Sequence, residues 1–238
     1  MRGILPDDVG FEPSRGLGPA VVGFDFDGTL AEQRGGWSLL YRLFGVEDAG
    51  EARTEAFWAG ELSYEEWITG NVDDFRERGV RRRHVERAAE AVKLKPGVEA
   101  LLTDLREADI PFGIVSAGVF ALIEPVLEFD PAFVVANEIV YDDGIPVDAV
   151  PRVPPESKGP ILSALCEQAG VDPADAVYVG DSKIEDGAFE VVGTSVLLDP
   201  VDRVEDYDAT LVDERVVEDD LTALRELLLP DASRSDES

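Results

Sequence analysis

The chain is poor in cysteine, histidine and long apolar runs. Its 238 residues include one cysteine, one histidine and one methionine. The single cysteine, Cys166, cannot form an internal disulfide, and its apolar neighbours predict a small buried side chain. No apolar run reaches the length of a membrane span, and no signal-peptide pattern begins at Met1. We therefore expect a soluble, cytoplasmic protein without a membrane partner.

Lysine is also scarce, with four residues in a chain that carries 51 acidic residues and a net charge of −30. Such a charge repels nucleic acid and anionic lipid, so neither is an expected partner. Acid-rich, lysine-poor usage resembles that of proteins from halophiles that accumulate salt, where the Debye length falls to roughly 3 Å. We expect a halophilic protein; the alternative is an acidic mesophilic one.

Short apolar runs alternate with helical patterns after residue 96, which is typical of a parallel sheet wound on both faces. The pattern predicts helices over 97–109, 118–128, 158–169 and 216–229, and strands over 112–115, 133–135, 176–180, 194–198 and 209–212. A hairpin is expected around Asp143 and Gly144.

The remaining segments are assigned by their lack of strands. Residues 1–19 are expected to form a leader loop, and residues 230–238 a disordered tail. Residues 31–95 have helical periodicity and no convincing strand, so they are predicted to form a helical cap. The core domain would then comprise 20–30 and 96–229.

One stretch carries the strongest chemical signal, because the apolar run from Val21 to Phe24 leads directly into Asp25, Asp27, Gly28 and Thr29. Residues two apart on a strand share a face, so both carboxylates can address one point. That point would lie at the carboxyl edge of the sheet, where open α/β folds bind ligands.

Three later segments add polar groups at comparable places. Ser116 and Ala117 follow the apolar run 112–115, Lys158 begins a predicted helix, and Asp181 follows the run 176–180. In this order the four segments resemble the motifs of the haloacid dehalogenase superfamily of aspartyl-phosphate hydrolases. The helical insertion and the segment 134–147 are similar to the phosphoserine phosphatase branch. The resemblance implies an α/β fold with a doubly wound, Rossmann-like parallel sheet and a small helical cap after its first strand.

The resemblance also implies roles for individual residues. Asp25 would be the nucleophile, and Asp27 the general acid and base. Ser116, Ala117, Lys158 and Gly28 would hold the phosphate.

A magnesium ion is expected because an anionic nucleophile must approach an anionic phosphate. The ligands implied by the resemblance are Asp25, the backbone of Asp27, and Asp181. Either Glu185 or Asp186 would complete the set, since each lies at a spacing that the superfamily uses.

The resemblance departs in the cap, where substrate specificity is determined. Arg34 stands where phosphoserine phosphatases place the glutamate that receives the substrate ammonium, and Asn71 stands near the position of their carboxylate-binding arginine. Glu32 or Glu65 would have to replace that glutamate.

The sequence therefore predicts a magnesium-dependent phosphomonoesterase for a small soluble phosphate ester, with no obligate protein partner. Two alternatives stay open. One is phosphoryl transfer to a small alcohol, and the other is a non-catalytic, metabolite-binding descendant.

Overall fold

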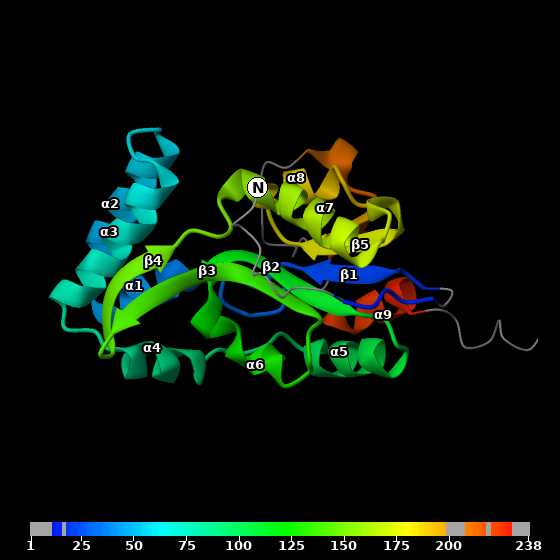
Figure 1. Cartoon of the computed structure of the whole chain (residues 1–238), viewed down its shortest axis with the longest axis horizontal. Coiled ribbons are helices and arrows are strands. Elements are labelled where there is room, and N and C mark those ends of the chain that lie inside the picture. The colour runs from blue at the N-terminus through cyan, green and yellow to red at the C-terminus, as the bar shows by residue number, and fades with distance from the viewer. Residues whose placement is uncertain (1–10, 16–17, 199–207, 218–219, 230–238) are drawn as a thin grey trace, which may run out of the picture.

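A seven-stranded sheet forms the centre of the computed structural model, which describes residues 11–15, 18–198, 208–217 and 220–229 (Figure 1). The strand order is β4-β3-β2-β1-β5-β6-β7, and all neighbours are parallel except β3 and β4. The strands are β1 (Val21–Phe24), β2 (Phe112–Val119), β3 (Phe133–Asp142), β4 (Ile145–Val150), β5 (Ala176–Gly180), β6 (Thr194–Leu198) and β7 (Glu214–Val216). The chain order reverses at β1, which lies between β2 and β5, so this is the switch point at which such sheets bind ligands.

Helices cover both faces of the sheet, and four more, inserted in the sequence after β1, lie at the left of the view in Figure 1. The inserted helices are α1 (Gly36–Phe44), α2 (Glu47–Trp58), α3 (Tyr64–Glu77) and α4 (Arg82–Ala89). The later helices are α5 (Val98–Glu107), α6 (Glu124–Leu127), α7 (Lys158–Ala169), α8 (Asp186–Phe189) and α9 (Leu224–Leu228). This arrangement confirms the predicted fold class, a mostly parallel sheet with a helical insertion after its first strand.

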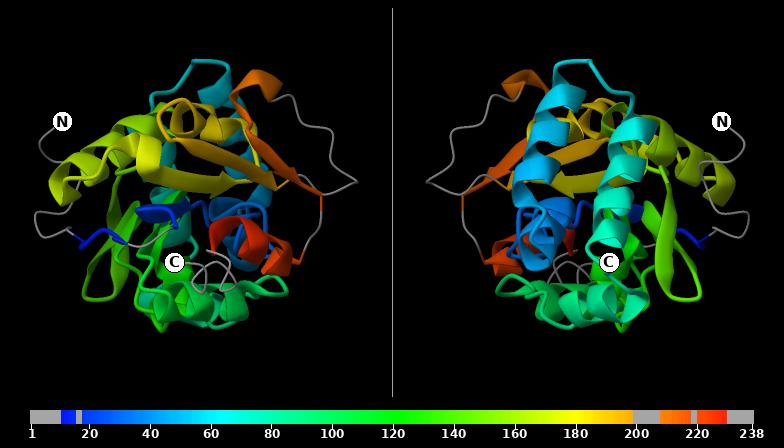
Figure 2. Two further views of the ribbon diagram at one scale, coloured as in Figure 1. Left: turned by 90° about the vertical axis from the view of Figure 1, so that its right-hand side faces the viewer. Right: turned by 90° about the vertical axis from the view of Figure 1, so that its left-hand side faces the viewer.

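Local sequence explains where the inserted helices start and stop. Ser63 and Glu66 form a capping box at the start of α3, which satisfies two backbone N–H groups. Helix α1 ends at Gly45, whose φ of 68° lies in the left-handed region that terminates helices. The right-hand view of Figure 2 shows α2 and α3 standing side by side.

Backbone pairing joins the two ends of the insertion. Ala31 forms an antiparallel bridge with Leu94, and the Glu32 N–H donates to the Lys93 carbonyl at 2.9 Å. This pairing supports a cap comprising residues 31–95, although the division into domains remains a prediction.

Three hydrophobic clusters account for the buried core. One lies under α5, α6 and α9 and includes Leu101 and Ile114, and a second lies under α7 and α8 and includes Leu162. The third joins the inserted helices to the hairpin of β3 and β4, through contacts that include Trp67 and Ala149. The insertion is therefore packed on the hairpin as well as on the carboxyl edge of the sheet.

The structure differs from the sequence prediction at three elements. The helix predicted from 118 begins later, because β2 continues to Val119 with a shift in register after Ser116. The strand predicted at 209–212 is wrong: a single 3-10 turn occupies Ala209–Leu211, and the strand is β7. The helix predicted over 216–229 is confined to the last turns, because Asp220 caps the short turn at Leu221–Ala223 that precedes α9.

Several predictions fall outside the described residues. These are the leader loop at 1–10 and 16–17 and the tail at 230–238. Within the described ranges, no helix combines the length and the apolar character needed to span a bilayer.

Candidate active site

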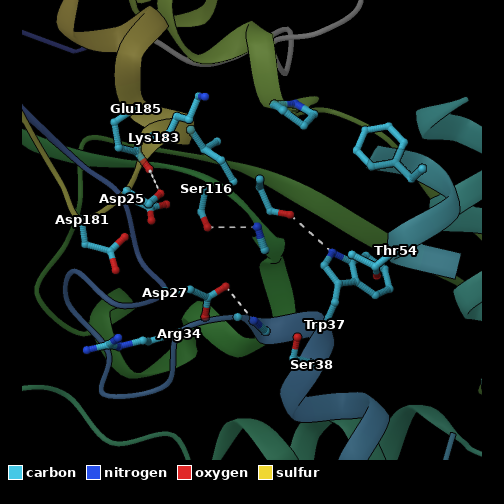
Figure 3. Close-up of a pocket in the computed structure, with 18 of the residues that line it drawn as sticks. Asp25, Asp27, Arg34, Trp37, Ser38, Thr54, Ser116, Asp181, Lys183 and Glu185 are labelled. Carbon is cyan, nitrogen blue, oxygen red and sulfur yellow. Dashed lines mark hydrogen bonds between the residues drawn. The ribbon is translucent and has the colours of Figure 1, made fainter. Parts of the chain in front are cut away.

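The candidate active site lies at the carboxyl ends of β1, β2 and β5, where a pocket of about 360 Å³ separates the sheet from the inserted helices (Figure 3). Asp25 and Asp27 follow β1, Ser116 lies near the end of β2, and Asp181 follows β5. Lys158 is the first residue of α7. The fold therefore brings together groups that are up to 156 positions apart, from Asp25 to Asp181, around one cavity.

Lys158 is a buried cation held between two carboxylates. Its Nζ lies 3.0 Å from Asp25 Oδ1 and 2.8 and 2.7 Å from the two oxygens of Glu185. Burial alone would lower the pKa of Lys158, but Asp25 and Glu185 raise it above its ordinary value, so the side chain stays charged. Burial raises the pKa of Glu185, against the opposing effect of Lys158.

Three acids converge beside this cation. Asp25, Asp181 and Glu185 each offer an oxygen within 4.8 Å of the others, and all three side chains are buried. Gly28 permits this approach: its φ is +82°, and a Cβ there would stand 2.0 Å from Asp181 Oδ2. Hard carboxylate oxygens of this kind suit Mg²⁺.

Asp186 does not join this group of acids. Its side chain is half-buried, and burial together with Asp208 raises its pKa. Of the two acids that the sequence left open, the structure thus places Glu185 with Asp25 and Asp181.

Asp27 lies on the other side of Asp25 and is fixed by two hydrogen bonds. The Gly36 N–H donates to its Oδ2 at 2.8 Å, and Gln33 Nε2 donates to its Oδ1 at 3.1 Å. Removal from water and the neighbouring Asp25 carboxylate raise the pKa of Asp27 to about 7. A carboxyl group with this pKa can donate and accept a proton near neutral pH.

The second half of β2 presents Ser116, Ala117 and Gly118 to the pocket. Ser116 is buried, and its Oγ accepts a hydrogen bond from the Gly118 N–H at 3.1 Å. The Ala117 carbonyl accepts from Trp37 Nε1 at 3.3 Å and from Asn137 Nδ2 at 2.7 Å. These two bonds fix the orientation of the Ala117 carbonyl and hold this part of β2 in place.

The opposite wall comes from the inserted helices, and it does not contain all the cap residues that the sequence singled out. Arg34 lines the pocket below Asp27 and Asp181 (Figure 3). Glu32 instead lines a separate surface hollow beside Lys93, and Glu65 is exposed on α3 outside the pocket lining. Asn71 is fully buried and accepts a hydrogen bond from Arg53 Nη1 at 2.9 Å, also outside the pocket lining.

Sequence reasoning missed two side chains that support the site. Gln33 holds Asp27, and Asn137 links the Ala117 carbonyl to the cap through Tyr64, whose hydroxyl accepts from Asn137 Nδ2 at 2.8 Å. The available signal for Asn137 was an asparagine directly after the apolar run 133–136, since a polar side chain in a buried strand needs partners.

Comparisons with known proteins agree with this arrangement. A phosphoserine phosphatase of Halobacterium salinarum is 33% identical over 194 residues, which cover 76% of this chain and 86% of that protein. A phosphoserine phosphatase of Methanocaldococcus jannaschii is 26% identical over 181 residues, covering 74% of this chain and 83% of that protein.

Solved structures show the same fold. A substrate-bound phosphoserine phosphatase complex superposes with a TM-score of 0.71 at 21% identity, covering 88% of this chain and 98% of that one.

The sequence profile of haloacid dehalogenase-like hydrolases matches residues 22–184, a range that contains Asp25, Asp27, Ser116, Lys158 and Asp181. The chain therefore belongs to the haloacid dehalogenase-like hydrolase family.

Proposed function

We propose that the protein is a magnesium-dependent phosphomonoesterase that hydrolyses a small phosphate ester through a phosphorylated Asp25. The observation that carries this proposal is the pairing of two unlike carboxyl groups at one pocket. Asp25 lies 3.0 Å from the Lys158 cation, whereas the pKa of Asp27 is raised to about 7. One group is thus suited to attack as an anion and the other to carry a proton.

The reaction would proceed in two displacements at phosphorus. In the first, an Asp25 carboxylate oxygen forms a bond to phosphorus while the bond to the ester oxygen breaks. The protonated Asp27 carboxyl gives its proton to the departing alkoxide. In the second, Asp27 takes a proton from water as that water attacks phosphorus, which releases phosphate and regenerates Asp25.

Four residues would form the phosphate site. Lys158 supplies a positive charge, Ser116 a hydroxyl, and Ala117 a backbone N–H, while Gly28 lets the chain approach closely. Glu185 would act through Lys158, because its two hydrogen bonds fix the position of the ammonium group.

Magnesium would be held by Asp25, Asp181 and Glu185, with the backbone of Asp27 as a further ligand. Lys158 pairs with Asp25 and Glu185, and the three carboxylates are hard oxygen ligands that fit a divalent ion. When bound, the ion would reduce the repulsion between the phosphate and Asp25.

The names of the relatives suggest phosphoserine as one candidate substrate, but Arg34 argues for a different small ester. A guanidinium in the pocket disfavours a substrate ammonium and favours a carboxylate, phosphate or hydroxyl-rich group. We further propose that the enzyme is cytoplasmic and adapted to molar salt. The net charge of −30 and the Halobacterium salinarum relative support the salt adaptation.

The test is a screen of metabolite phosphate esters in molar KCl with and without Mg²⁺. We expect phosphate release from at least one ester, lost on chelation and restored by Mg²⁺. Phosphate release that is independent of Mg²⁺ would contradict the metal assignment. No turnover of any ester would favour a binding protein, and transfer to an added alcohol without release would favour a phosphotransferase.

A further inference from the structure

The wall of the pocket formed by the inserted helices is built from aromatic rings. Six aromatic side chains line it: Trp37, Tyr41, Phe57, Trp58, Tyr64 and Trp67. The chain has three tryptophans, and all three are in this wall. Figure 3 shows Trp37 and Thr54 on the side of the pocket opposite Asp25 and Glu185.

The rings are in continuous contact from the interior to the surface. Ring centroids are 5.5 Å apart for Trp37 and Trp67, 5.7 Å for Trp67 and Phe57, and 5.0 Å for Phe57 and Trp58. These separations are typical of favourable aromatic pairs. A flat group entering from solvent would therefore meet an ordered surface.

Part of this wall is core, but its outer part is not. Trp37, Tyr41 and Trp67 are buried in the hydrophobic cluster of the insertion, whereas Trp58 is 60% exposed and belongs to none of the three clusters. Packing in the hydrophobic cluster thus accounts for the presence of the inner rings. It does not account for the large exposed side chain of Trp58. Covering a large exposed ring at a ligand pocket is favourable.

The charge distribution argues against a substrate ammonium at this wall. The acids that line the pocket are Asp25, Asp27, Asp181 and Glu185, and all of them lie outside the four inserted helices. Among the described residues, no carboxylate of α1, α2 or α3 lines it. The cations that line the pocket, Arg34, Lys158 and Lys183, also lie outside those helices, so among the described residues the wall formed by the helices carries no charged side chain.

We propose that the alcohol part of the substrate carries a flat, uncharged ring that stacks against Trp58 and Phe57 while its phosphate lies at Asp25. This inference rests on the proposed phosphomonoesterase activity, and it names the class of ester that the pocket selects.

The test compares three alkyl esters of similar leaving ability: phenylethyl phosphate, propyl phosphate and phosphoserine. We expect kcat/KM for phenylethyl phosphate to exceed the value for each of the others by about tenfold or more. Binding of the three corresponding phosphonates, which cannot be hydrolysed, is measured by calorimetry in the same buffer with Mg²⁺. The same order of affinity is expected.

Two variants locate the preference on the wall. Trp58→Ala should remove most of it through a higher KM for phenylethyl phosphate. Leu43→Ala is the matched control, since Leu43 is 54% exposed on α1 outside the pocket lining. It should leave the preference intact.

The outcomes separate the two claims. Turnover and binding without a preference for the ring, or with a preference for phosphoserine, would overturn the aromatic pocket while leaving the phosphatase intact. An equal loss of preference in Leu43→Ala and Trp58→Ala would also overturn it. Tight, ring-selective phosphonate binding without turnover of any ester would support the pocket and overturn the proposed activity.

Discussion

The two sides of the pocket are held in place by different forces. On the sheet side, the position of each polar group depends on charge compensation, as Lys158 between Asp25 and Glu185 shows. On the cap side, rings such as Trp37 and Trp67 are placed by packing in a hydrophobic cluster. We therefore expect the sheet side to tolerate a single changed charge poorly, and the cap side to tolerate the exchange of a ring for an apolar side chain of similar volume.

This difference suggests that the sheet side carries out phosphoryl transfer and the cap side recognises the alcohol part of the substrate. The groups proposed for phosphoryl transfer lie at strand ends or, for Lys158, at the start of a helix, where the backbone fixes them. Groups that would recognise the alcohol lie on helices that contact the core through the hairpin of β3 and β4. A related enzyme can then keep its chemistry while its substrate changes.

The largest effect is expected for Asp25→Asn. The change is nearly isosteric, so the fold should persist, but the nucleophile is lost and turnover should fall by several orders of magnitude. Phosphate release by freshly purified protein measures the effect, with circular dichroism as the control for folding. Near-native activity would show that the sheet side does not supply the nucleophile.

Lys158→Met should affect both stability and activity. It leaves Asp25 and Glu185 as buried, unpaired carboxylates, so we expect a loss of about 3–5 kcal/mol in the free energy of unfolding at pH 7. The loss should shrink as pH falls toward 4, because burial raises the pKa of Glu185 and its protonated form needs no partner cation.

Urea unfolding at several pH values measures this loss. Lys93→Met, at an exposed lysine, is the matched control and should change the unfolding free energy by less than about 0.5 kcal/mol. Equal effects of the two changes would refute the charge-compensated description of the sheet side.

The pH dependence of activity should follow Asp27. Its pKa is raised to about 7, so the fraction able to protonate a leaving alkoxide declines above that pH. We expect kcat/KM for an alkyl ester to fall about tenfold per pH unit above this pKa. Asp27→Asn should abolish this limb of the profile. A wild-type profile that stays flat from pH 6 to 9 would assign proton transfer to another group.

Arg34→Glu tests whether Arg34 determines the preference against a substrate that carries an ammonium group. The change should raise kcat/KM for phosphoserine relative to propyl phosphate by an amount equivalent to about 1–3 kcal/mol, because an acid would then face the substrate ammonium. Arg42→Glu makes the same charge change on the exposed face of α1 and controls for the overall field. If both variants respond alike, Arg34 acts only through net charge.

Salt should change the stability of the whole molecule and leave its discrimination between esters nearly constant. Screening relieves repulsion among the excess carboxylates, so the melting temperature is expected to rise from low to molar KCl. Thermal unfolding at several KCl concentrations checks it. A flat or falling melting temperature would remove the halophilic interpretation.

The positions of the polar residues on the sheet side could be predicted from the sequence, because each is marked by the few residues next to it. Asp25, Ser116 and Asp181 each lie at or just beyond an apolar strand, and parallel strands place their carboxyl ends at one edge. The choice between Glu185 and Asp186 needed the structure, because it depends on which carboxylate the turn after β5 directs toward Lys158.

The cap side could not be predicted in the same way. Trp37, Phe57 and Trp67 come from three helices, and only the packing of those helices brings their rings to one pocket. The contacts of Asn137 likewise depend on Tyr64, which is 73 positions away. Helical periodicity identified the insertion but carried no information on which residues would face Asp25.

The most direct test of the account is the identity of the residue that is phosphorylated during turnover. Asp27→Asn should slow hydrolysis of the phosphorylated enzyme, because the water loses its general base. We would mix this variant with Mg²⁺ and p-nitrophenyl phosphate, whose leaving group departs without a proton from Asp27, quench in acid, and map the modified peptide by mass spectrometry. The account predicts a phosphoryl group on Asp25. A phosphoryl group on another residue, or turnover in the wild type with no covalent phosphate in either protein, would contradict it.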